Sequence, residues 1–130
     1  MTVIDTSVLA AIFLKEEDWE RLLTFLHATP SPKISAATLV ETVIVLEWRV
    51  QDSVRERLGR LLRGLAAMVE PVTEARALLA ADAYRRYGKG YHSAHLNYGD
   101  CFAYALAKEL DAPLLYKGND FAQTDIRSAL

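Results

Sequence analysis

The stretch that decides the fold is LNYGDCFAYALAKEL, residues 96–110. From Cys101 onward its apolar residues recur every three or four positions, which predicts a helix with one buried face. Asp100 stands at the head of this helix, next to the predicted core. Two interpretations are open: Asp100 caps and charges a helix start with Asn97 as the N-cap residue, or it joins other acids in a metal site.

Short apolar segments alternate with helical ones along the rest of the chain. Helices are predicted at 6–14, 16–28, 36–50, 53–65 and 73–87, and strands at 2–5, 33–35, 68–72 and within 111–120. This alternation is typical of an α/β domain with a central parallel sheet. Sites in such sheets form beyond the carboxyl ends of the strands, so we expect Asp5 and Asp120 to lie at the same edge.

Composition limits the class of protein. The 130 residues predict a single domain, 1–130, and no stretch approaches the roughly 18 apolar residues of a membrane span. The N-terminus MTVIDTSVL lacks the basic segment of a signal peptide, so we expect a cytoplasmic protein without a membrane partner. Cys101 is the only cysteine, which excludes an internal disulfide and a cysteine-based zinc site. The net charge of −2 argues against a polyanionic partner unless several carboxylates surround a cation.

Four acids are candidates for one site, and each has an ordinary structural explanation as well. Asp5 can cap the first helix, Asp120 is a typical turn residue, and Thr38 with Glu41 has the spacing of a capping box. If Ser35 is the N-cap residue instead, Glu41 lies one turn inside its helix and is half-buried. No Lys or Arg stands three or four positions away to pair with it, which favours a metal site.

The four acids together are harder to explain than any one of them. Two carboxylates about 5 Å apart repel by about 3 kcal/mol at an effective dielectric constant of about 20. Four at one edge of a sheet would be protonated in part or held by a cation. Oxygen ligands alone select Mg²⁺ or Mn²⁺ over zinc.

Four segments of the chain, in order, resemble the PIN domain family, and within it the VapC-type toxin ribonucleases of type II toxin–antitoxin systems. They are VIDTSVLAAIF, ISAATLVETVIVLE, LNYGDCFAYALAKEL and PLLYKGNDFAQTDI. The resemblance covers nearly the whole chain and implies a three-layer α/β/α PIN-like fold with a central parallel β-sheet and a carboxylate-lined groove. It assigns Mg²⁺ or Mn²⁺ binding and catalysis to four acids, with two polar residues in support: Asp5, Glu41, Asp100 and Asp120, with Thr6 and Asn119. Asp125 is the alternative for the fourth acid, and Asp120 is preferred because it directly follows a strand and a tight turn.

The resemblance also implies the activity and the partners. The activity is that of an endoribonuclease that hydrolyses RNA phosphodiester bonds with a water activated by one or two metal ions. The partners are RNA, a cognate antitoxin whose segment occupies the groove, and a second copy of the chain in a homodimer. We expect the dimer surface on the helices after Thr6 and Trp19. Candidate contacts to RNA phosphates are the basic residues before Asp100 or beside Asp120, namely Arg85, Arg86, Lys89 and Lys117. The alternative function is a catalytically silent PIN-like module that binds RNA or protein.

Overall fold

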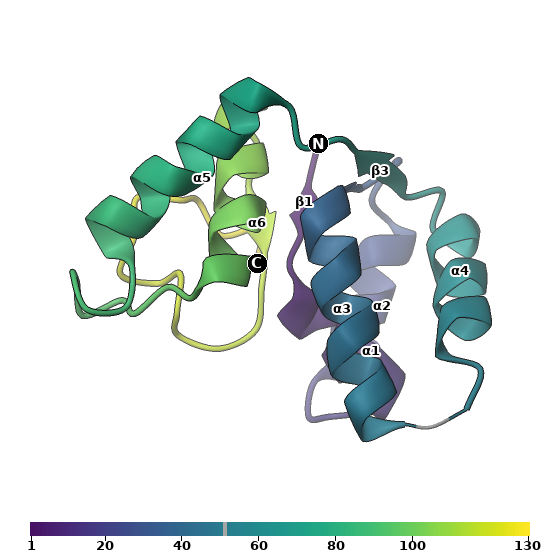
Figure 1. Cartoon of the computed structure of the whole chain (residues 1–130). Coiled ribbons are helices and arrows are strands. Elements are labelled where there is room, and N and C mark those ends of the chain that lie inside the picture. Colours follow the sequence, from purple (N-terminus) through teal and green to yellow (C-terminus); the bar gives the residue numbers. More distant parts are fainter. Residues whose placement is uncertain (51) are drawn as a thin grey trace.

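The strands and helices form three layers, shown in Figure 1 for the computed structural model, which describes residues 1–50 and 52–130. The strands are β1 (Val3–Ile4), β2 (Lys33–Ser35), β3 (Met68–Glu70) and β4 (Leu114–Leu115). All their pairings are parallel and the order across the sheet is β3-β2-β1-β4. The predicted α/β class with a central parallel sheet is therefore confirmed.

Helices cover both faces of this sheet. They are α1 (Thr6–Leu14), α2 (Trp19–His27), α3 (Ala36–Arg49), α4 (Val54–Gly64), α5 (Glu74–Tyr87) and α6 (Tyr98–Glu109). Figure 1 shows α5 and α6 on one side of the strands and α1 to α4 on the other. Neighbouring strand residues point to opposite faces. Val3 and Leu114 accordingly belong to the core with α5 and α6, and Ile4 and Leu115 to the core with α1, α2 and α4.

Side-chain caps mark where four of the described helices begin, and at α5 the cap is Thr73, which accepts a hydrogen bond from Arg76 N. Asp5 accepts a hydrogen bond from Ser7 N at the start of α1, and Ser35 accepts one from Ala37 N at the start of α3. At α6, Asn97 and Asp100 form a reciprocal capping box. The helix of the quoted stretch therefore begins at Tyr98, before the apolar run that predicts it, and the capping interpretation of Asp100 is correct.

One sequence-based expectation about the helices is wrong. The second helix begins at Trp19 and not at residue 16, because Lys15 and Asp18 both have positive φ angles, of 54° and 69°, and interrupt the helical backbone. The apolar residues of α1 and α2 lie largely in the core, and the dimer surface expected on these helices stays a prediction. Exposed apolar side chains lie instead on α3 and α6, among them Ile44, Trp48 and Tyr98.

Within the two described ranges, no helix combines the length and the apolar character needed to cross a membrane.

Candidate active site

A cavity of about 280 Å³ brings the four candidate acids together, and we call it the acidic cavity. Asp5 follows β1, Glu41 lies on α3, Asp100 lies in the first turn of α6, and Asp120 lies in the segment after β4. The other residues that line it are Thr6, Ser7, Ala10, Leu14, Glu16, Val45, Arg49, Asn97, Lys117 and Phe121. Folding thus gathers side chains that lie far apart in the sequence.

Asp5 is the most buried of these acids, with 3% of its surface exposed. One carboxylate oxygen, Oδ2, accepts hydrogen bonds from Ser7 N at 3.0 Å and Ser7 Oγ at 2.7 Å. The other, Oδ1, is buried and has no hydrogen-bond partner among the described residues. Burial raises the pKa of Asp5 to about 6, against the lowering effect of the Ser7 hydrogen bonds. A buried oxygen without a partner in the protein is one that a bound water molecule or a cation can satisfy.

Glu41 is half-buried and is held by hydroxyl groups instead of a basic residue. Thr6 Oγ1 donates to Glu41 Oε1 at 2.6 Å, which links α1 to α3. Thr42 Oγ1 lies 3.1 Å from Thr6 Oγ1 and 2.8 Å from the Thr38 carbonyl oxygen, so it helps to hold the Thr6 hydroxyl in position. Thr38 and Thr42 are fully buried. The carboxylate of Glu41 therefore has a defined direction but no countercharge from these contacts.

Gly99 leaves the space that the carboxylate of Glu41 occupies. A Cβ atom at this position would overlap the Glu41 carboxylate. Because residue 99 has no side chain, the Glu41 carboxylate can lie against the start of α6. The glycine in the sequence YGD thus has a direct role in bringing Glu41 next to Asp100.

Asp100 has two roles in the structure. Its Oδ2 accepts a hydrogen bond from Asn97 N at 2.9 Å, as the capping box requires. Burial raises the pKa of Asp100 to about 7, and the charges of Asp5, Asp120 and Glu41 add to this rise. The capping role and the proximity to the other acids coexist, because only one carboxylate oxygen takes part in the cap.

The carboxylate oxygens of the four acids are suitable ligands for a hard divalent cation. In this structure, however, the four carboxylates do not surround a common point. In their present positions, no three His, Cys, Asp or Glu side chains of the described residues are close enough to hold a metal ion. Glu41 is turned toward Thr6, and Asp120 lies exposed at the rim. A cation bound near the unsatisfied Oδ1 of Asp5 would offset the unfavourable burial of charge that raises the pKa values of Asp5 and Asp100.

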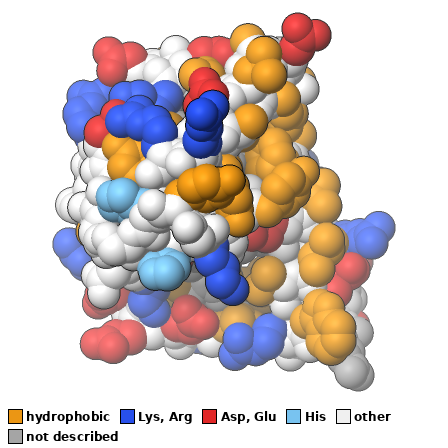
Figure 2. All heavy atoms as spheres, turned by 60° about the vertical axis from the view of Figure 1, so that its left-hand side comes forward, with side chains coloured by type: hydrophobic (Ala, Val, Ile, Leu, Met, Phe, Trp, Pro, Cys, Tyr) orange, Lys and Arg blue, Asp and Glu red, His pale blue; other side chains and the backbone are white. Residues whose placement is uncertain are grey.

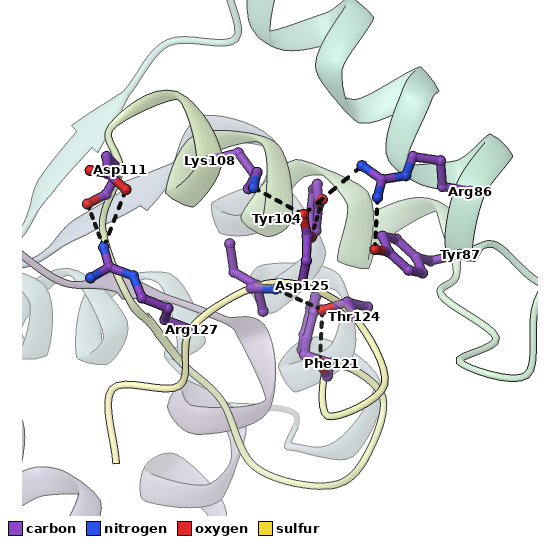
Figure 3. Close-up of polar contacts among 10 residues, drawn as sticks. Arg86, Tyr87, Tyr104, Lys108, Asp111, Phe121, Thr124, Asp125 and Arg127 are labelled. Carbon is purple, nitrogen blue, oxygen red and sulfur yellow. Dashed lines mark hydrogen bonds and ion pairs between the residues drawn. The ribbon is translucent and has the colours of Figure 1, made fainter.

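Asp125, the alternative fourth acid, lies in a different polar cluster (Figure 3). Its carboxylate accepts hydrogen bonds from Tyr104 Oη and from Lys108 Nζ, and Arg86 approaches it at 4.0 Å. These partners hold the pKa of Asp125 below its usual value despite its partial burial. Asp125 therefore connects the C-terminal segment to α6 and α5, whereas Asp120 faces the acidic cavity.

Of the candidate supporting residues and basic residues, some line the acidic cavity and others do not. Thr6 and Lys117 line the acidic cavity, and Lys117 Nζ lies 3.4 Å from Glu16 Oε1. Asn119 does not line it, and its carbonyl oxygen accepts a hydrogen bond from Ala122 N in a turn. The remaining basic candidates, Arg85, Arg86 and Lys89, also lie outside the cavity lining.

The sequence analysis missed two charged residues of the cavity lining. Glu16 reaches the site because the backbone reverses at Lys15, directly after α1. Arg49 reaches it from the last turn of α3, two turns beyond Glu41 on the same helix face. The spacing of Glu41, Val45 and Arg49 is the sequence signal that could have indicated the second case.

In α/β folds with a parallel sheet, ligands bind beyond the carboxyl ends of the strands, and Asp5 and Asp120 follow two such ends. Comparison with known families identifies the class more closely, because the PIN domain family matches residues 2–127. Ribonuclease VapC of Mycolicibacterium smegmatis is 45% identical over 124 residues, which are 95% of this chain and 96% of that protein. Ribonuclease VapC30 of Mycobacterium tuberculosis is 44% identical over 124 residues, 95% of each chain.

Solved structures show the same fold at lower sequence identity. VapC20 of Mycobacterium tuberculosis, described as a sarcin-ricin loop cleaving toxin, superimposes with a TM-score of 0.79 at 18% identity, covering 97% of this chain and 96% of that one. A toxin–antitoxin complex from Klebsiella pneumoniae gives a TM-score of 0.70 at 19% identity, covering 96% and 93%. The chain belongs to the PIN domain family, in its group of VapC ribonucleases.

Proposed function

We propose that this chain is the endoribonuclease toxin of a type II toxin–antitoxin pair and that it hydrolyses RNA phosphodiester bonds with the help of Mg²⁺ or Mn²⁺. Relatives named as ribonucleases, 44–45% identical over 95% of the chain, support the reaction class. The observation that carries the proposal is the buried, unsatisfied Oδ1 of Asp5 in a cavity shared with the other three candidate acids, Glu41, Asp100 and Asp120.

The residues that would hold the ion are Asp5, Glu41, Asp100 and Asp120. A divalent cation, when bound, neutralises charge on the phosphate and lowers the pKa of a water molecule so that it can attack. Thr6 fixes the direction of the Glu41 carboxylate, and Ser7 fixes that of Asp5. Asp100 keeps one oxygen available because its cap uses only the other. These hydrogen bonds hold Asp5 and Glu41 at the cavity before substrate arrives.

Cleavage of labelled RNA by the purified protein tests this proposal. We expect cleavage that requires Mg²⁺ or Mn²⁺ and stops on addition of a chelator. The Asp100→Asn variant keeps the size of the side chain and should lose at least about a hundredfold in rate. Asp82→Asn, on the exposed part of α5, is the matched control and should retain full activity. Equal cleavage by the parent and Asp100→Asn would remove the metal-nuclease assignment, and RNA binding without cleavage by the parent would favour the alternative of a silent binding module.

An apolar groove beside the acidic cavity supports the antitoxin partner. A pocket of about 540 Å³ between α3 and α6 is lined by Val40, Ile44, Tyr98 and Phe102, and also by Glu41, which it shares with the acidic cavity. Figure 2 shows hydrophobic side chains gathered over this face of the molecule. Val40, Ile44 and Tyr98 are more than half exposed, which is unusual for large apolar residues without a partner. A segment of the antitoxin that fills this groove would also cover the site at Glu41.

Co-expression tests the partner assignment. Growth arrest on induction of this chain should be relieved by the product of the neighbouring gene. An Ile44→Asp substitution should weaken that relief while leaving RNA cleavage intact, because Ile44 lines the groove and not the acidic cavity. Undiminished relief by the variant, with unchanged complex formation, would place the antitoxin elsewhere. The homodimer implied by the resemblance stays a prediction that light scattering of the purified chain can measure.

A further inference from the structure

We infer that Arg49 is a phosphate-binding residue of the acidic cavity and holds an RNA phosphate adjacent to the one cleaved at the four acids. The inference rests on the proposed ribonuclease function and deepens it by naming a contact to the substrate backbone. It is carried by the position of Arg49 along α3, by the shape of the cavity and by the charges around it.

One face of α3 leads from the acids to Arg49. Glu41, Val45 and Arg49 are spaced four residues apart, so they lie on the same side of the helix, and all three line the acidic cavity. Eight residues of α-helix rise about 12 Å. This separation of the two backbone positions leaves room for Arg49 to bind a phosphate next to the one at the acids.

The opposite wall of the cavity repeats this arrangement. Thr6, Ala10 and Leu14 are also spaced four residues apart and line the cavity from α1, which contacts α3. Both helices begin close together, where Thr6 donates to Glu41, and both contribute residues from their last turn. Residues from the first to the last turn of α1, and from Glu41 to the last turn of α3, therefore line the cavity, so that Arg49 stands further along α3 than the acid Glu41.

The lining of the acidic cavity carries both signs of charge. The acids repel a phosphodiester, and Arg49 attracts one. Lys117 is already paired with Glu16 at 3.4 Å, whereas Arg49 forms no ion pair with any carboxylate in residues 1–50 and 52–130. Arg49 is exposed, and a guanidinium group offers several donors that bind phosphate oxygens in pairs. A basic residue in the last turn of a helix also interacts favourably with the helix dipole, and in that role alone Arg49 would not contact RNA.

The test is the salt dependence of RNA binding, measured by fluorescence anisotropy with a labelled single-stranded oligonucleotide. Asp100→Asn serves as the background, so that the RNA stays intact, and Arg49→Ala is added to it. We expect about tenfold weaker binding at 0.1 M salt, and a plot of log affinity against log salt that is less steep by about 0.7, the contribution of one single-stranded phosphate contact. Arg49→Lys keeps the charge and should retain most of the slope.

Arg60→Ala is the matched control, because Arg60 lies on the exposed face of α4 and pairs with Glu56. The inference is overturned if Arg49→Ala and Arg60→Ala bind RNA alike, or if neither the background protein nor its variants bind RNA in a salt-dependent way. Thermal denaturation checks that each variant is folded. An absence of cleavage by the parent, together with binding that depends on Arg49, would refute the nuclease proposal and leave the phosphate site standing.

Discussion

Thr6 Oγ1 donates a hydrogen bond of 2.6 Å to Glu41 Oε1, and this contact joins α1 to α3 at the acidic cavity. Thr6 is only 8% exposed, so water does not easily replace it. The hydroxyl of Thr42 lies 3.1 Å behind Thr6 and is itself fully buried. The carboxylate of Glu41 is thus oriented by neutral hydroxyl donors, which do not compensate its negative charge.

We predict that Thr42→Val lowers cleavage by about tenfold and weakens the affinity for the divalent ion. Valine has the shape of threonine but cannot bind Thr6, so the Thr6 hydroxyl loses its support and Glu41 loses its fixed direction. Thr42→Ser retains a hydroxyl group and should restore activity. Titration of activity and of intrinsic fluorescence with Mn²⁺ provides the measurement. Equal ion affinity in parent, valine and serine variants would show that Thr42 has a packing role only.

We predict that Gly99→Ala greatly reduces cleavage while most of the fold is retained. The new Cβ would occupy the position of the Glu41 carboxylate and force it out of the site. Gly64→Ala is the control, since a Cβ there meets no atom within 4 Å. Circular dichroism and cleavage rates of the two variants should separate the local effect from a general one. Full activity of Gly99→Ala would contradict the placement of Glu41.

The stability of the metal-free protein should fall as the pH rises from about 4 to about 7. Burial raises the pKa of Asp5 to about 6 and that of Asp100 to about 7, from 3.8 for the free side chains. Between these values the folded protein binds more protons than the unfolded chain, so the free energy of unfolding decreases with increasing pH. Below about pH 4 both carboxyl groups are protonated in the folded and in the unfolded state, so their titration no longer changes the free energy of unfolding.

Thermal denaturation at pH 5 and pH 8 measures this dependence, with Asp100→Asn as the comparison. The variant lacks one of the two titrating groups and should lose less stability over the same interval. Addition of Mg²⁺ or Mn²⁺ at pH 8 should raise the melting temperature of the parent more than that of the variant, because ligand binding favours the folded state. An identical pH dependence in both proteins would argue against the raised pKa of Asp100.

We predict opposite effects for Asp120→Asn and Asp125→Asn. Asp120 is exposed and lines the acidic cavity, so its substitution should reduce cleavage without a change in stability. Asp125 accepts hydrogen bonds from Tyr104 and Lys108, and its substitution should lower the free energy of unfolding by about 1 kcal/mol while cleavage by the folded protein persists. Urea denaturation and cleavage rates, measured on both variants, decide between them. The reverse pattern would make Asp125 the fourth acid.

Local sequence determined the elements of this protein. The strand VI and the capped starts at Asp5, Ser35 and Asn97 depend on neighbouring residues, whose propensities and hydrogen bonds act within one turn. The order of strands and helices indicated a parallel sheet, and the positions of the acids relative to strand ends indicated a shared edge. The start of α2 was less predictable, since the positive φ angles of Lys15 and Asp18 arise from how the chain turns between two packed helices.

Only the tertiary structure decided which side chains meet. Asp120 and Asp125 are five residues apart in one polar segment, and the contact of Asp125 with Tyr104 separates their environments. Packing between distant elements also decides three further features. These are the position of the Glu41 carboxylate against Gly99, the hydroxyl contact between Thr6 and Glu41, and the presence of Arg49 in the lining of the acidic cavity. Propensity and spacing act along the chain, whereas a site of this kind is defined by distances across it, and those are determined only when the helices pack.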